Sequence, residues 1–353
     1  MKRFSLLLYL GLICCWTGSA QQIRFEGTIY DKSTGEPLQG VYVYMNGTSI
    51  YTMTDSSGVF TLSLEKHINA SLIIRHMAYE QVVIENPYKQ MPGKIYLEEA
   101  RISFEEVRVV VSADKFSRDE KLYAFKRQFL GLSKSGKGCK IENEEDIIIS
   151  YDREERALKA YSQKPLIIYN NYLGYRVEFS LVNFKVLYGE RDSIAEDDFI
   201  KFNFSGYSSF EDMMPYDVVM KRRRDEIYEQ SSRYFMKQLV NRALEETNFK
   251  MFSRYKRVDA DDCFVTIGDS SVKSVHLLSE IKNNRYYENI SSEVFGSVTL
   301  RNRVNESEII FLTNRFLVDE YGNVDEIDNI IYLGYMNELR FGGMLPLNYE
   351  YSK

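Results

Sequence analysis

The first part of the chain alternates short apolar runs with clusters of Gly, Pro, Asp and Ser. Runs of this kind, rich in β-branched and aromatic residues and bounded by turn residues, indicate antiparallel strands joined by tight turns. Asp55 and Gly58 occupy the first and fourth positions of a typical β-turn. The expected strands are Ile23–Tyr30, Val41–Met45, Val59–Leu64, Ser71–Arg75, Gln81–Ile84 and Lys94–Leu97. This many short strands in residues 23–98 predict a β-sandwich.

Residues 99–113 follow as a boundary segment. They begin with charged residues, which favour a linker, and continue with the apolar run Val107–Val111. That run predicts a strand that adds to the domain on either side.

A short amphipathic helix is expected after this boundary. Ser117 and Glu120 match a capping box, in which the Ser hydroxyl accepts from a free helix N–H and the Glu reaches back. Phe125 and Phe129 follow at helical spacing, and Gly131 is a suitable end for the helix.

The remainder of the chain predicts more strands and one long helix. Tyr175–Tyr188 is the longest alternating run, Lys221–Phe249 carries apolar residues along one helical side, and Asp319 to Asn323 predicts a hairpin turn. Residues 114–353 are therefore expected to form an α+β domain, a curved antiparallel sheet with packed helices. The other strands expected there are Ile147–Tyr151, Ala157–Ser162, Leu166–Tyr169 and Phe199–Phe204.

The N-terminus has the pattern of a secretion signal. Two basic residues precede the apolar run Leu6–Cys15, and small residues end at Ala20. This pattern describes a signal peptide over residues 1–20, and the run is shorter than the roughly 20 residues that span a bilayer. Acylation at Cys14 or Cys15 is the alternative, but the preceding residues are not the small ones such a site requires. We expect an exported chain, soluble or peripherally attached, in the periplasm or at the outer membrane.

Charge and cysteine content narrow the function classes. The formal net charge is −6, and the signal removes only basic residues, so the mature chain is more acidic still. Nucleic acid is therefore not an expected partner, because phosphate binding needs clustered Lys and Arg. Cys139 and Cys263 remain after processing. One disulfide, as exported proteins often contain, and two separate buried thiols are both consistent with the sequence.

The stretch from Gly27 to Phe60 resembles the carboxypeptidase-like regulatory domain, a small transthyretin-like β-sandwich that occurs as a non-catalytic appendage. Later motifs, among them Pro165–Asn170, Ser231–Lys237 and Met344–Tyr349, are similar to elements of exported proteins that carry this domain in outer-membrane-bearing bacteria. The resemblance implies a mainly β fold and no particular reaction. Such proteins usually have His at position 234, and this chain has Tyr there.

Motifs for catalysis are incomplete. The glycine spacing of residues 131–138 is similar to that of a phosphate-binding loop. Such a loop needs Ser or Thr for magnesium where this chain has Gly138, and it follows a strand, whereas a helix is expected before residue 131. A flexible helix-to-strand loop is therefore the preferred interpretation. His67, His76 and His276 lack the paired spacing of a catalytic zinc site. We therefore expect no cofactor, no metal and no catalytic residues.

Four consecutive basic residues make the strongest positive cluster of the chain. They are Lys221, Arg222, Arg223 and Arg224. The cluster can contact acidic lipid headgroups or lipopolysaccharide phosphates. The alternative is the exposed start of a helix, although positive charge there opposes the helix dipole.

Aromatic residues offer a second candidate site. The chain has 27 Tyr and 21 Phe, and Tyr169, Tyr172 and Tyr175 are close enough in sequence to line a groove in which sugars stack. The alternative is that they pack half-buried in strands, as most tyrosines of amphipathic strands do.

These observations favour a non-enzymatic exported protein that binds or scaffolds an envelope component. Similar sandwiches precede outer-membrane transporters, and exposed sheet edges accept a partner's strand. The alternatives are a glycan- or peptide-binding protein that uses the concave side of the second domain's sheet, and an unrecognised hydrolase. The oligomeric state does not follow from the sequence.

Overall fold

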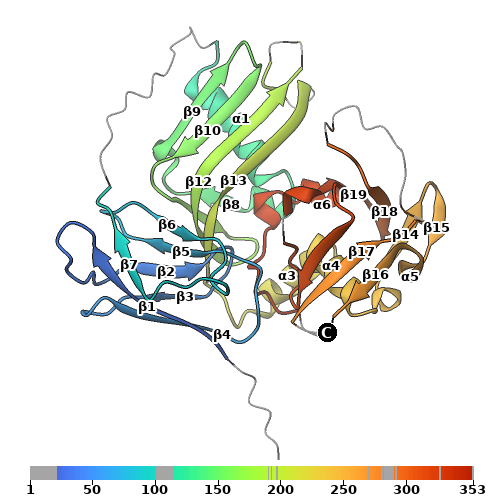
Figure 1. The fold of residues 1–353 in the computed structure, drawn as a ribbon. Helices are drawn as coiled ribbons and strands as arrows, with labels where there is room; N and C mark the ends of the chain where they lie inside the picture. The colour runs from blue at the N-terminus through green and yellow to red at the C-terminus, as the bar shows by residue number, and fades with distance from the viewer. Residues whose placement is uncertain are drawn as a thin grey trace, which may run out of the picture.

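The computed structural model describes residues 22–100 and 115–351, except 190, 192, 196–197, 269–270, 280, 282–289, 291 and 326. The described chain forms three adjoining units, each around its own hydrophobic core (Figure 1). The expected signal peptide with Cys14 and Cys15, and the expected strand Val107–Val111, lie outside the described residues.

The N-terminal unit is a β-sandwich, as predicted. Alternate side chains of its two sheets point into one core, where Ile29, Val43 and Ile74 are fully buried. The structure adds one strand, β3, that the sequence pattern did not indicate. One sheet has the order β4 (Val59–Leu64), β1 (Ile23–Asp31) and β7 (Lys94–Leu97). The other has the order β3 (Tyr51–Met53), β2 (Tyr42–Met45), β5 (Leu72–Arg75) and β6 (Val82–Ile84).

The middle unit, green in Figure 1, is a six-stranded sheet covered by helix α1 (Arg118–Leu130). The predicted capping box between Ser117 and Glu120 is present at the start of α1. Phe125 and Phe129 of α1 are fully buried against the sheet, where Phe125 meets Phe184 edge to face. The strands are β8 (Cys139–Ile141), β11 (Leu166–Asn170), β12 (Tyr175–Tyr188), β10 (Ala157–Ser162) and β9 (Ile147–Asp152), with β13 (Phe199–Asp212) also paired to β12.

The single helix predicted over Lys221–Phe249 is wrong, because the chain breaks there. The structure has α3 (Val218–Tyr228) and α4 (Ser232–Val240), a 3₁₀ turn at Leu244–Glu246, and then strand β14 (Phe249–Ser253). The break falls at Ser231, whose hydroxyl accepts from the Tyr234 backbone N at 3.2 Å and so caps α4. A serine that caps a new helix competes with continuation of the old one.

The C-terminal unit packs α4 against two further sheets. Phe235 and Met236 of α4 are fully buried in its core. The predicted turn is present: the Gly322 N–H donates to the Asp319 carbonyl, and Val318 pairs with Val324. One sheet has the order β15 (Lys256–Val258), β14, β18 (Gly296–Asn302), β19 (Asn305–Phe311) and β21 (Ile330–Gly334); the other has β16 (Phe264–Ile267), β17 (Val272–Leu277) and β20 (Arg315–Asp319).

The predicted fold class, mainly β with packed helices, is confirmed. The expected single curved sheet differs from the structure in one respect. Strands of the described chain beyond residue 114 are divided among three sheets around two cores. The short helix α2 (Lys134–Lys137) precedes β8, α5 (Ala260–Cys263) connects β15 to β16, and α6 (Tyr335–Glu338) follows β21.

Candidate functional site

The sandwich contacts the middle unit through the turn of residues 46–49, between β2 and β3. The Gly47 N–H donates to the Ser208 carbonyl at 2.7 Å, and the Phe210 N–H donates to the Thr48 carbonyl at 2.9 Å. Gly47 has φ 74°, a conformation that glycine adopts without strain. The turn therefore adds a short parallel bridge to β13 of the middle unit.

The same turn also binds the C-terminal segment. The Leu347 N–H donates to the Gly47 carbonyl at 2.7 Å. The Ser49 N–H donates to Asn348 Oδ1 at 3.1 Å, and Asn348 Nδ2 donates to Ser49 Oγ at 3.0 Å. Backbone and side-chain bonds thus fix the sandwich to β13 and to the C-terminal segment, whose Leu345 and Tyr349 pack in the core of the middle unit, so it is not a loosely tethered appendage.

A buried carboxylate forms a second connection. Asp319 is 1% exposed, and its Oδ1 accepts from the backbone N–H groups of Tyr321 and Asn323, each at 2.9 Å. Its Oδ2 accepts from the Asn69 N–H of the sandwich at 2.9 Å and from Asn323 Nδ2 at 2.8 Å. Four N–H donors from both units satisfy this carboxylate.

A cleft of about 820 Å³ lies between the sandwich and the C-terminal unit. Its lining includes four carboxamides and two tyrosines, and two basic side chains balance two acidic ones. These groups are Asn46, Asn69, Asn86, Asn323, Tyr88 and Tyr332. Carboxamides and hydroxyls both donate and accept hydrogen bonds, so the cleft suits a neutral polar ligand.

Two polar atoms in the walls of this cleft lack a protein partner. They are His67 Nδ1 and Asn323 Oδ1, both buried. Burial lowers the pKa of His67, so the imidazole is neutral at pH 7, and its ring stacks on Tyr88 with centroids 4.0 Å apart. Buried polar atoms are normally hydrogen-bonded, so unpartnered ones mark where the protein has not satisfied its own groups.

Arg233 of α4 also lines the cleft. Its guanidinium donates to the Pro346 carbonyl at 2.8 Å and the Leu345 carbonyl at 3.2 Å. Burial lowers the pKa of Arg233, and among the residues that the structure describes no carboxylate forms an ion pair with it. Its partners in the protein are therefore neutral carbonyls.

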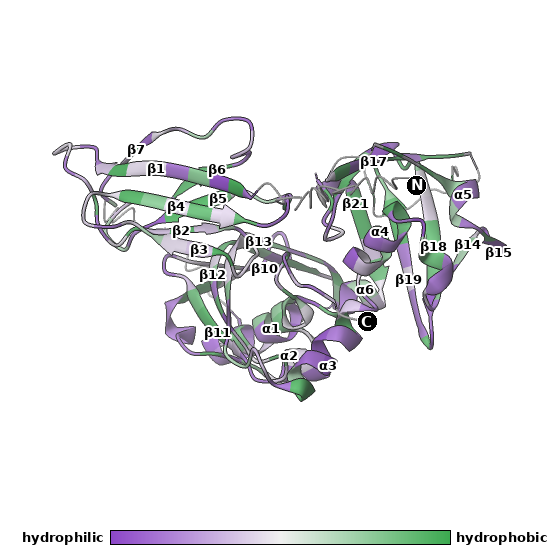
Figure 2. Ribbon diagram, turned by 90° about the horizontal axis from the view of Figure 1, so that it is seen from below, coloured by the Kyte–Doolittle hydropathy of each residue, from purple (hydrophilic) through white to green (hydrophobic). Residues whose placement is uncertain are grey.

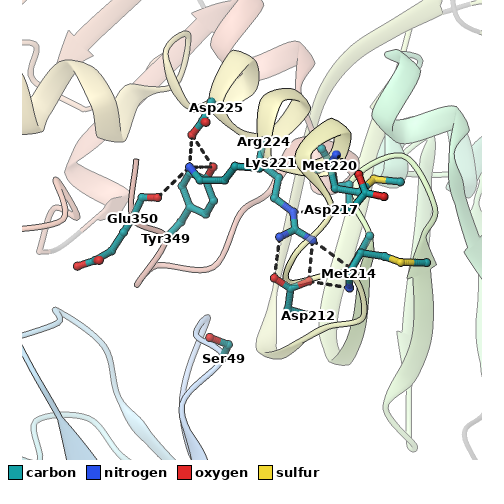
Figure 3. A network of polar contacts seen from close by, with 12 residues as sticks. Ser49, Asp212, Met214, Asp217, Met220, Lys221, Arg224, Asp225, Tyr349 and Glu350 are labelled. Atoms are coloured by element: carbon teal, nitrogen blue, oxygen red, sulfur yellow. Dashed lines mark hydrogen bonds and ion pairs between the residues drawn. The ribbon is translucent and has the colours of Figure 1, made fainter. Parts of the chain in front are cut away.

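The predicted basic cluster does not form one exposed patch. Arg224 is 3% exposed and makes a two-point ion pair with Asp212, at 2.6 and 2.7 Å (Figure 3). Its Nε donates to the Leu173 carbonyl at 2.7 Å, and its guanidinium lies 4.0 Å from the ring centroid of Tyr175. Arg224 thus joins α3 to the sheet of the middle unit.

Lys221, about one helical turn before Arg224 on α3, is also engaged. Its ammonium lies 2.5 Å from Asp225 and 2.9 Å from the Tyr349 hydroxyl, and also donates to the Glu350 carbonyl (Figure 3). The Tyr349 hydroxyl donates to Asp225 at 2.6 Å. Burial and this hydrogen bond raise the pKa of Tyr349. Lys221 therefore fastens the C-terminal segment to α3.

The other two members of the cluster are more accessible. Arg223 lies over the Tyr172 ring at 4.5 Å and donates to the Tyr172 carbonyl. The Arg222 side chain is 71% exposed and only 3.9 Å from Glu226. The exposure that contact with an anionic surface needs is therefore greatest at Arg222.

The three predicted groove tyrosines do not line a common groove. Tyr169 pairs with Arg176, and Tyr175 pairs with Asn170, in the β11–β12 register. Because successive side chains of a strand point to opposite faces, Tyr169 and Tyr175 lie on different faces of the sheet. Tyr175 is 3% exposed, in the core, and Tyr172 lies outside both strands, under Arg223.

Cys139 and Cys263 are not joined by a disulfide. Cys139 packs against the core of the middle unit, and Cys263 is buried in the core of the C-terminal unit. Burial raises the pKa of Cys139 to about 12, so its sulfur stays a thiol at neutral pH and is a poor nucleophile.

The glycine-rich segment at residues 131–138 is not the flexible loop that we expected. It forms the short helix α2, capped by Ser133. A Cβ placed on Gly136 would lie 2.4 Å from the Gly131 carbonyl oxygen, and one on Gly342 would lie 2.3 Å from the Gly136 Cα. Backbone packs directly on backbone, which leaves no room for a phosphate.

Two kinds of feature are absent from the described residues. Among them, no cluster of three or more His, Cys, Asp and Glu side chains has an arrangement that could hold a metal ion. Their helices include none with the length and apolar character needed to cross a membrane.

Sequence reasoning missed the cleft and its key residues. In the sequence Asp319 indicated only a turn, and Arg233 belonged only to the motif Ser231–Lys237. Asn69 and Asp319 are 250 positions apart, so no local pattern indicates that they meet. The one sequence signal for this site was the presence of Asp319 and Asn323 in the same predicted turn, where their side chains can form a hydrogen bond.

Comparison with known proteins identifies the first unit. Residues 25–109 match the family model of the CarboxypepD_reg-like domain, which confirms the resemblance found in the sequence. No curated protein matches the chain. The match covers the sandwich, and the other two units are interpreted from their structure.

Proposed function

We propose that this chain, whose N-terminal unit is a non-catalytic regulatory-like domain, is an exported, non-enzymatic binding protein of the cell envelope. Its place is the periplasm or the periplasmic side of the outer membrane. Its ligand is a neutral glycan, held in the cleft between the sandwich and the C-terminal unit.

The chemistry of the cleft is the observation that carries this proposal. Four carboxamides, two tyrosine rings and a balanced charge line a space of about 820 Å³, which lies within the usual range for ligand sites of about 300–1,000 Å³. Sugar hydroxyls donate and accept hydrogen bonds, and sugar ring faces pack on aromatic rings. The cleft offers partners for both.

The junction supports binding without large rearrangement. Of the lining residues, Asn323 is held by its side-chain bond to the Asp319 carboxylate, and Asn69 by its backbone bond to Asp319 and by the bond from its Nδ2 to the Asn323 carbonyl. A ligand therefore meets side chains whose positions are set, which lowers the entropy cost of binding. Asp319 itself accepts four hydrogen bonds, so it has little capacity left for proton transfer.

Ligand binding is tested by thermal unfolding of residues 21–353 with a panel of defined probes. The panel contains tetrasaccharides of glucose, xylose, mannose and N-acetylglucosamine, and one unstructured neutral peptide. At least one tetrasaccharide should raise the midpoint of unfolding. Asn86→Ala, at the cleft, should abolish that shift, whereas Asn171→Ala, an exposed asparagine of the middle unit, should preserve it.

Mass spectrometry of the recovered probe separates binding from catalysis. The proposal expects an unchanged mass after prolonged incubation. A cleaved oligosaccharide would identify a hydrolase, and a shift with the peptide alone would replace the glycan by a peptide ligand. No shift with any probe would overturn the proposal for this cleft.

A second candidate is a scaffold that adds a partner's strand to β3. This strand ends its sheet, and Tyr51 and Met53 on it are 51% and 56% exposed. The backbone groups of Ile50 and Thr54 face β2, because the Met45 N–H donates to the Ile50 carbonyl and the Thr54 N–H donates to the Val41 carbonyl. Backbone groups alternate in direction along an edge strand, so the Met53 N–H points away from β2, toward the open edge of the sheet. Crosslinking in intact envelopes should capture an envelope protein, and Met53→Pro should lose it.

A further inference from the structure

Six consecutive residues, running from the loop after β13 into the first turn of α3, form an exposed apolar tip. Met214 through Val219 are all exposed, and five of the six are Met, Pro, Tyr or Val. Tyr216 is 96% exposed and Val218 is 81% exposed. In Figure 2 the apolar start of α3 stands out at the edge of the molecule, beyond the polar remainder of the helix.

Hydrogen bonds at both ends hold this tip in place. Met214 N–H donates to Asp212 at 2.9 Å, and Asp217 accepts from the backbone N–H groups of Val219 and Met220 at 2.8 and 2.9 Å (Figure 3). Asp212 is in turn held by Arg224. The backbone that carries Tyr216 and Val218 is therefore fixed, and these two side chains are largely exposed to solvent.

The tip contains one acidic residue, the exposed Asp217. Basic side chains lie on α3 and on the nearby helix α2. Arg222 follows one helical turn after Val218, and Arg223 lies over Tyr172. Tyr172 contacts Gly138 at the end of α2, whose Lys134 and Lys137 are exposed. The acidic side chain nearest Arg222 is Glu226, at 3.9 Å. Four cations thus come from two neighbouring helices.

We propose that this tip inserts into the surface of an anionic lipid bilayer. An apolar tip that is convex fits the deformable surface of a membrane, whereas a protein partner would need a matching pocket. Tyr216 suits the headgroup level, the Val and Met side chains suit the acyl boundary, and Arg222 suits lipid phosphates. None of these residues lines the cleft, so this inference goes beyond the proposed function and is tested separately.

Sedimentation with vesicles tests the insertion. Residues 21–353 are mixed with vesicles of phosphatidylcholine alone and of phosphatidylcholine with phosphatidylglycerol. Binding should be stronger with phosphatidylglycerol and weaken at high salt. The double variant Tyr216→Ser/Val218→Asp should bind about tenfold more weakly, and Arg222→Gln should reduce only the preference for phosphatidylglycerol.

A matched control uses an equally exposed valine elsewhere. Val304, in the β18–β19 turn, is 95% exposed, and Val304→Asp should leave vesicle binding unchanged. Asp at position 218 is compatible with folding, because acidic residues are favourable in the first turn of a helix. Circular dichroism checks that each variant is folded.

Three outcomes would overturn the proposal. They are no binding of the wild-type chain to either vesicle, equal losses in the tip variant and in Val304→Asp, and a wild-type dimer that Val218→Asp dissociates while vesicle binding is absent. The last result would assign the tip to contact between two copies of the chain.

Discussion

Arg222 and Arg224 are two arginines of one helix for which the structure predicts very different roles. The same substitution, Arg to Gln, at each position gives a matched comparison. Arg224 is 3% exposed and paired with Asp212, whereas the Arg222 side chain is 71% exposed. If the four basic residues acted only as a surface cluster, the two substitutions would have similar effects on stability.

The cost of Arg224→Gln follows from its contacts. Removing one partner of a buried ion pair costs about 3–5 kcal/mol, and the lower end applies because the Asp212 side chain is 30% exposed. The Leu173 carbonyl, which accepts at 2.7 Å, loses a donor worth about 1 kcal/mol. Glutamine recovers part of this, so we expect a loss of about 3–4 kcal/mol. Arg222→Gln should change stability by less than about 0.5 kcal/mol.

Equilibrium unfolding in urea measures the difference. Residues 21–353 contain no tryptophan, since the single one is Trp16, so far-UV circular dichroism and tyrosine fluorescence report the unfolding of this fragment. The dependence of the unfolding free energy on urea concentration should be similar in the two variants, and Arg224→Gln should unfold at the lower urea midpoint. Free energies of unfolding within about 1 kcal/mol of each other would refute the structural role of Arg224.

Three further predictions concern the cores, acid stability and the thiols. Phe235→Asp buries a charge in the core of the C-terminal unit and should remove cooperative melting of that unit, as followed by calorimetry; a retained native melt would show the packing to be wrong. The hydrogen bond from Ser33, with others, holds the pKa of Asp31 well below its usual range. Its carboxylate therefore stabilises the sandwich above the unfolded value of about 3.9 and loses this effect as pH falls below it. The stability difference between wild type and Asp31→Asn should accordingly shrink from pH 6 to pH 2, and a constant difference in acid unfolding would contradict this. In the native chain Cys139 and Cys263 should react with a maleimide only slowly at pH 7, and both should react fully in urea; rapid native labelling of Cys139 would contradict its burial.

Local patterns sufficed for much of the fold. Each predicted strand of the sandwich is present, because alternation and turn residues act within a few positions. The helix start at Ser117 was equally predictable, since both members of its capping box are three residues apart. Boundaries that depend on tertiary pairing were less accurate: β13 extends to Asp212, beyond the predicted end at Phe204, because it follows β12 along its length.

The candidate site required contacts that no local pattern encodes. Ser231 looked like one more polar position on a long helix, and its capping role appears only once α4 packs in a different core from α3. In the sequence Arg224 is one of four consecutive basic residues and suggests surface charge. In the structure it is paired with Asp212 and lies over the Tyr175 ring. The cleft arises from segments far apart in sequence that meet at Asp319.

Hydrogen–deuterium exchange of residues 21–353, with and without the oligosaccharide that gives the largest thermal shift, tests binding in the cleft most directly. Protection is predicted in residues 67–71, 85–89 and 322–325, which line it, with the oligosaccharide recovered intact. Protection confined to the groove around residues 242–261, or a cleaved oligosaccharide, would contradict the account.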